Sequence, residues 1–126
     1  MRRSVCGIRY TPDRLGLDAN RTYYEWIGHG LELYEALADA QLHAVECFPT
    51  ASWTCWWGPR GKATRARWSS QALASLGLGS VPDRLGQDAR DAIGAALTAR
   101  EAARGNVERF GFIVVPLPVV LSPDPR

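Results

Sequence analysis

Three carboxylates in this sequence have the residue type and spacing of a site for divalent cations. Glu46 lies within an apolar run, where a buried carboxylate costs free energy unless a cation, hydrogen bonds or a metal ion satisfies it. Asp88 and Asp91 are three residues apart near the start of an expected helix, so both side chains project from one face and can converge on one cation. Glu46, Asp88 and Asp91 are therefore the candidate metal ligands and catalytic residues.

Each of these carboxylates also has a purely structural interpretation. Glu46 can pair at a strand end with Arg65 or Arg67. Aspartates near a helix N-terminus offset the helix dipole and cap free N–H groups, which accounts for Asp88 or Asp91 without any metal ion. The residue pattern alone leaves both interpretations open.

A basic and tryptophan-rich segment follows Glu46. The sequence contains no acidic residue over 47–82, and four cationic side chains fall within eight positions of that stretch. Interleaved basic and aromatic side chains suit phosphate contacts combined with base stacking. Alternatively, Trp68 and one of the paired tryptophans belong to the core, and the arginines are merely solvated. The candidate nucleic-acid contacts are Trp57, Arg60, Lys62, Arg65 and Arg67.

The expected secondary structure places the candidate carboxylates on a strand and on a helix. Apolar residues recur at helical intervals over 22–40, and 42–48 is a short apolar run typical of a buried strand. An alanine stripe on the helix that carries both aspartates predicts close packing against a sheet. Further helices are predicted from Pro49 to Trp57, over about 64–76 and over about 87–104, with a last strand over 110–115.

Length and composition predict one globular domain. A chain of 126 residues with 46% apolar and 22% charged residues has the size and composition of a single core, with 1–21 as an irregular first segment and 117–126 as a proline-rich tail. The three cysteines are odd in number and lack Cys-x-x-Cys spacing, which argues against disulfides and structural zinc. No apolar run reaches the length of a membrane span, and no signal peptide is apparent, so we expect a cytoplasmic protein without a membrane partner.

Several motifs, taken in order, resemble one known family. The residues that carry the resemblance lie in five segments, 46–53, 59–61, 87–93, 96–100 and 110–116. Together they resemble the predicted-nuclease family with an RNase H-like fold that is catalogued as domain of unknown function 429. Cys47 and Phe48 depart from the aliphatic residue and tyrosine of many members, but the acidic residues match. The resemblance covers the C-terminal half of the family's pattern, and the family's N-terminal acidic strands have no counterpart here.

This resemblance implies a fold, an activity and a cofactor. The expected fold is α/β, a partial RNase H-like domain with few strands packed against about three to four helices. The implied activity is two-metal phosphodiester hydrolysis with magnesium or manganese at Asp88, Asp91 and Glu46. Because the acidic strands are missing, we expect only weak metal binding and no nuclease activity by this chain alone.

Two hypotheses follow. The first is a nuclease-like domain that is incomplete as an isolated chain. The alternative is a non-catalytic module that binds nucleic acid or completes a partner. Strands without neighbours expose unpaired backbone groups, so a homo-oligomer or a partner chain that supplies the missing strands is also expected.

Overall fold

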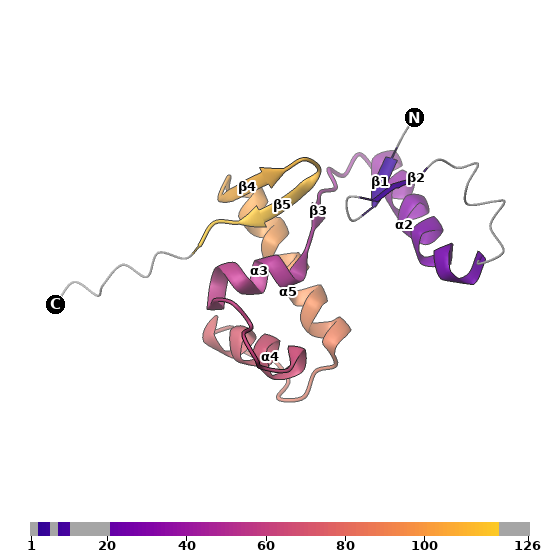
Figure 1. The fold of residues 1–126 in the computed structure, drawn as a ribbon. Helices are drawn as coiled ribbons and strands as arrows, with labels where there is room; N and C mark the ends of the chain where they lie inside the picture. The colour runs from indigo at the N-terminus through magenta and orange to yellow at the C-terminus, as the bar shows by residue number, and fades with distance from the viewer. Residues whose placement is uncertain (1–2, 6–7, 11–20, 119–126) are drawn as a thin grey trace. The chain divides into compact units, whose positions relative to one another are not determined.

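The computed structural model describes residues 3–5, 8–10 and 21–118 (Figure 1). The chain divides into two compact units, and each is described by itself. Unit 1 comprises Met1–Glu46 with Gly111–Ile113, and unit 2 comprises Cys47–Phe110 with Val114–Arg126. The sequence-based prediction of one domain stays a prediction. Within the described ranges, no helix has both the length and the apolarity that crossing a membrane requires.

Unit 1 contains a two-stranded hairpin and one long helix. Strands β1 (Arg3–Val5) and β2 (Ile8–Tyr10) pair antiparallel, with Ser4 opposite Arg9. The prediction of an irregular segment over 1–21 was therefore wrong at these two strands, because three-residue strands are too short to show alternation. Residues 1–2, 6–7 and 11–20 of that segment lie outside the described residues.

Helix α2 (Arg21–Asp39) confirms the helix that the apolar period predicted. Leu31 and Tyr34 are half-buried, as that period requires. The helix ends in a left-handed residue, Gln41 at φ 58°, and the N–H of Leu42 donates to the carbonyl of Leu37 at 2.8 Å. A backbone turn of this kind satisfies carbonyls that the last helical turn leaves without partners.

The three helices of unit 2 begin and end close to the predicted positions. Helix α3 (Pro49–Trp57) has its proline in the first turn, where a missing N–H costs nothing. Helix α4 (Arg65–Ser75) is capped by Thr64, whose hydroxyl accepts from the backbone N–H of Arg67 at 3.3 Å. Helix α5 (Gln87–Ala103) is followed by Gly105 at φ 77°, a conformation that favours glycine.

A three-stranded sheet with the order β3-β5-β4 completes the fold, which is mixed α/β as predicted. Strand β3 (Glu46–Cys47) is shorter than the predicted run over 42–48. The single strand predicted over 110–115 is instead a hairpin of β4 (Val107–Phe110) and β5 (Ile113–Pro116). The prediction was wrong there because Gly111, at φ 63°, turns the chain inside what looked like one apolar run.

The core of unit 2 is built on tryptophan. Trp53, Trp68, Ala72 and Leu73 form its buried cluster, with Trp53 fully inaccessible to solvent. Trp56 meets the Trp53 ring edge-on, with ring centroids 5.5 Å apart. The indole N–H of Trp68 donates to the carbonyl of Gly58 at 3.0 Å, so its one polar atom is satisfied. The core position predicted for Trp68 is confirmed.

Helix α5 faces this core with a small and polar stripe, and not with the predicted alanines. Gly94 and Thr98 are fully buried on α5, whereas Ala92, Ala96 and Ala99 are exposed. The reason lies in the tryptophan core, because only a residue without a side chain admits the Trp53 ring at position 94.

A buried hydroxyl pair joins α3 to α5 and gives a first test. Ser52 Oγ and Thr98 Oγ1 are 2.8 Å apart, and the Thr98 hydroxyl also lies 2.8 Å from the carbonyl of Gly94, to which it donates. We expect Thr98→Val, which keeps the shape and removes the hydroxyl, to lower the free energy of unfolding by about 1–2 kcal/mol in urea titrations. Thr54→Val is the matched control, since the Thr54 hydroxyl is exposed and its removal should cost under about 0.5 kcal/mol. Equal effects of both variants would contradict the prediction.

Candidate functional site

Asp91 lies where the three helices of unit 2 meet. Its Oδ1 accepts hydrogen bonds from Trp53 Nε1 at 3.3 Å and from Gln87 Nε2 at 2.9 Å. Its Oδ2 accepts from an Arg65 guanidinium nitrogen at 2.8 Å. Both carboxylate oxygens are therefore engaged, and the three donors come from α3, α5 and α4.

The Arg65–Asp91 ion pair is the most exposed of these three links. The Arg65 side chain is 47% exposed and that of Asp91 is 20% exposed. Because water screens a pair of this exposure, we attribute no more than about 1 kcal/mol to it. The hydrogen bond from Trp53 is not weakened by water in this way. The Trp53 ring is fully buried, so water cannot replace Asp91 as the acceptor of its N–H.

Gln87 links Asp91 to Arg90 through further hydrogen bonds. The Gln87 carbonyl oxygen accepts from the Arg90 guanidinium at 3.0 Å and from the Ser69 hydroxyl at 3.2 Å. Arg90 Nε also donates to Ser69 Oγ at 2.8 Å. The Gln87 side chain is thus fixed at both ends, with its amide nitrogen on Asp91 and its oxygen on Arg90. The network holds α4 and the first two turns of α5 in register.

Sequence reasoning selected Asp91 but overlooked Gln87, Ser69 and Arg90. A local signal was present. Arg90 and Asp91 follow Gln87 at positions i+3 and i+4, the spacings at which helical side chains meet. Ser69 has no such signal, since it reaches the network from a different helix.

The other two candidate carboxylates are placed differently. Asp88 is exposed in the first turn of α5, where its charge offsets the helix dipole. Glu46 is buried, with 9% of its surface exposed, and it belongs to unit 1, whereas Asp88 and Asp91 belong to unit 2.

The two predicted ligands in unit 2 do not by themselves fit a pair of magnesium ions. Each such ion requires near-octahedral oxygen coordination, usually from several carboxylates together with water and phosphate. Of the three predicted ligands, unit 2 holds Asp88, which is exposed, and Asp91, whose oxygens already accept three hydrogen bonds. Among the residues that the structure describes, no group of three or more His, Cys, Asp or Glu is placed to hold a metal ion. The magnesium or manganese site stays a prediction.

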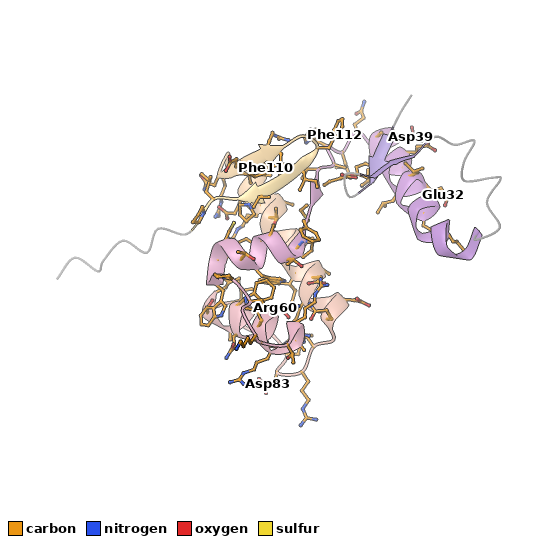
Figure 2. All side chains as sticks on the ribbon, in the orientation of Figure 1. Glu32, Asp39, Arg60, Asp83, Phe110 and Phe112 are labelled. Carbon is orange, nitrogen blue, oxygen red and sulfur yellow. The ribbon has the colours of Figure 1, made fainter. Side chains whose placement is uncertain are left out.

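The basic segment, here defined as Trp57, Arg60, Lys62 and Arg67, is exposed to solvent. Trp57 is 47% exposed, whereas Trp56 packs against the core and Trp68 is 2% exposed. The loop that carries Arg60 is fixed by a turn, in which Ala63 N–H donates to the Arg60 carbonyl at 3.2 Å (Figure 2). In the described part of the chain, Arg60, Lys62 and Arg67 form no ion pair, while Arg65 is bound to Asp91.

Cys55 does not have the properties of a nucleophile. Burial, and secondarily the negative charge of Glu108, raise the pKa of its thiol above the ordinary value. A raised pKa leaves less thiolate, which is the reactive form. Cys6 lies outside the described residues.

Comparisons with family models, with curated proteins and with solved structures gave no match to this chain. The resemblance to the RNase H-like predicted nucleases therefore rests on the motifs alone, and the function has to be argued from the geometry of the site.

Proposed function

We propose that unit 2 is a non-catalytic nucleic-acid-binding module in which Asp91 is a structural residue and the basic segment contacts the ligand. The observation that carries this proposal is which polar side chains are bound internally and which are exposed. Both oxygens of the Asp91 carboxylate accept internal hydrogen bonds. The three cations and the tryptophan of the basic segment remain exposed.

Charge supports a polyanionic ligand. The stretch over 47–82 holds no acidic residue, so nothing within it neutralises Arg60, Lys62 and Arg67. Phosphate contacts from such cations supply affinity without sequence preference. Trp57, exposed three residues before Arg60, offers a flat ring on which an unpaired base can stack. We therefore propose single-stranded nucleic acid as the ligand class.

The proposal explains the resemblance to RNase H-like nucleases by common ancestry. A module descended from an RNase H-like domain can retain the aspartates of its last helix while their role changes from metal ligand to hydrogen-bond acceptor. The proposal includes a cytoplasmic location. It also includes a second copy or a partner strand that covers the sheet, since β4 ends the β3-β5-β4 sheet as an edge.

Binding to a short fluorescein-labelled single-stranded DNA should fall steeply with salt. Three phosphate contacts predict a slope of log affinity against log salt of about −2. Loss of one contact should flatten this slope by about 0.7 in each of the variants Arg60→Gln, Lys62→Gln and Arg67→Gln. Trp57→Ala should instead weaken binding roughly tenfold at every salt concentration, because a stacking contact releases no counterions. Fluorescence anisotropy across a salt series measures both effects.

Arg109→Gln serves as the matched control, because Arg109 is an exposed cation on β4 that lies outside the basic segment. Its slope should equal that of the wild type. Absence of binding at low salt, or a slope that all four arginine and lysine variants change equally, would overturn the proposal. Cleavage of the labelled DNA by pure protein in magnesium or manganese would favour the nuclease hypothesis instead.

A further inference from the structure

Arg90, near the start of α5, carries a buried positive charge. It is 6% exposed, and its guanidinium donates to three neutral acceptors, the Ser69 hydroxyl, the Gln87 side-chain carbonyl and the Leu85 backbone carbonyl. Among the described residues it forms no ion pair. Burial of an arginine without an opposite charge is costly, and such residues are almost always paired.

The guanidinium has hydrogen-bonding capacity left. An arginine has five N–H groups, and the three hydrogen bonds use one on Nε and one on each terminal nitrogen. Each terminal nitrogen therefore keeps one N–H. Two N–H groups on neighbouring nitrogens match the two oxygens of a carboxylate.

A pocket of about 260 Å³ lies against this arginine. Its wall is mixed in polarity, with Leu73 and Ala74 from α4 and Leu78, Val81 and Leu85 from the loop that precedes α5 as its apolar part. Asp83 is the one acidic residue of the lining, and it is exposed in the loop (Figure 2). The pocket thus combines a buried cation, an apolar patch and one exposed acidic side chain.

These features select the chemical class of the ligand. The apolar patch of Leu73, Leu78 and Val81 favours a compact hydrocarbon body, and the volume limits that body to a small molecule. The Asp83 carboxylate disfavours a dianion such as phosphate more than a monoanion. An acid with one carboxylate and a compact apolar body fits all three features.

We propose that the pocket between α4 and the loop before α5 binds a small monocarboxylate through Arg90. The ligand's carboxylate accepts from the two remaining N–H groups, and its apolar part lies against Leu73, Leu78 and Val81. This site is separate from the basic segment, since no residue of that segment lines the pocket. Failure of either proposal leaves the other intact.

Benzoate and its neutral analogue benzyl alcohol test the proposal on the full chain. We expect benzoate to shift the amide resonances of the loop over 78–86 saturably, and benzyl alcohol to bind at least about tenfold more weakly, since it lacks the charge-assisted hydrogen bonds. Asp83→Asn should tighten benzoate binding a few-fold by removing like-charge repulsion. Hexanoate against hexanol repeats the comparison with an aliphatic body.

Two variants connect the binding to this pocket. Arg90→Met should abolish the preference for benzoate over benzyl alcohol, but it also removes three internal hydrogen bonds. Ala74→Phe avoids that problem, because Ala74 is exposed on α4 and a larger side chain there fills the pocket without disturbing the core. It should abolish binding of both compounds. Any one of three outcomes would overturn the proposal. These are equal affinity for benzoate and benzyl alcohol, no saturable shift in either the wild type or Asp83→Asn, and unchanged binding by Ala74→Phe.

Discussion

Gly94→Ala should destabilise unit 2 by about 1–2 kcal/mol, although alanine is the better helix former. A Cβ at position 94 would lie 2.8 Å from Cζ2 of Trp53, and 3.2 Å and 3.4 Å from two neighbouring ring atoms. The ring cannot move aside easily, because it is fully buried and its N–H is bound to Asp91. The cost of overpacking, about 1–3 kcal/mol, therefore exceeds the gain of up to about 1 kcal/mol in helix propensity.

Gly28→Ala is the matched control for this prediction. Gly28 also lies inside a helix, α2, but a Cβ there would meet nothing within 4 Å. The same substitution should stabilise that helix by roughly 0.5–1 kcal/mol. Thermal unfolding followed by far-ultraviolet circular dichroism should show opposite signs for the two variants. A stabilised Gly94→Ala protein would mean that the α3–α5 approach is looser than the structure has it.

Asp91→Ala should cost about 2–4 kcal/mol, because it leaves the buried N–H of Trp53 and the Gln87 amide without their acceptor. Asp91→Asn should cost only about 1 kcal/mol. An asparagine oxygen in the Oδ1 position keeps the hydrogen bonds from Trp53 and Gln87, whereas its amide nitrogen replaces the oxygen that Arg65 requires.

Asp88→Asn is the control for both Asp91 variants. Asp88 is exposed, so its replacement should change the free energy of unfolding by less than about 0.5 kcal/mol. Chemical denaturation of the four proteins gives the comparison. A metal-site interpretation predicts the opposite pattern, in which loss of either aspartate relieves repulsion and leaves the fold equally or more stable.

The sequence predicted the helices well because each carries its own local signals. Pro49 begins α3, the Thr64 hydroxyl caps α4, and the apolar period identifies α2. The hairpin of β4 and β5 was missed because one glycine divides an otherwise continuous apolar run, and a glycine alone does not distinguish a turn from a strand interior.

The candidate site was predictable in its residue types but not in their roles. Asp88 and Asp91 are both followed by alanine near the start of the same helix, yet one is exposed and the other accepts three hydrogen bonds. The difference comes from Trp53 and Arg65, which reach Asp91 from helices that are 38 and 26 residues away along the chain. No periodicity or spacing in a single sequence specifies such contacts.

The central claim, that the Asp91 carboxylate is a structural acceptor and not a metal ligand, is tested most directly at the Trp53 indole N–H, which is bound to that carboxylate. In nitrogen-15-labelled protein, titration with the paramagnetic ion Mn²⁺ broadens resonances close to a bound ion. We predict no selective, saturable broadening of the Trp53 indole resonance. Saturable broadening of this resonance that excess Mg²⁺ reverses would contradict the account and identify Asp91 as a ligand.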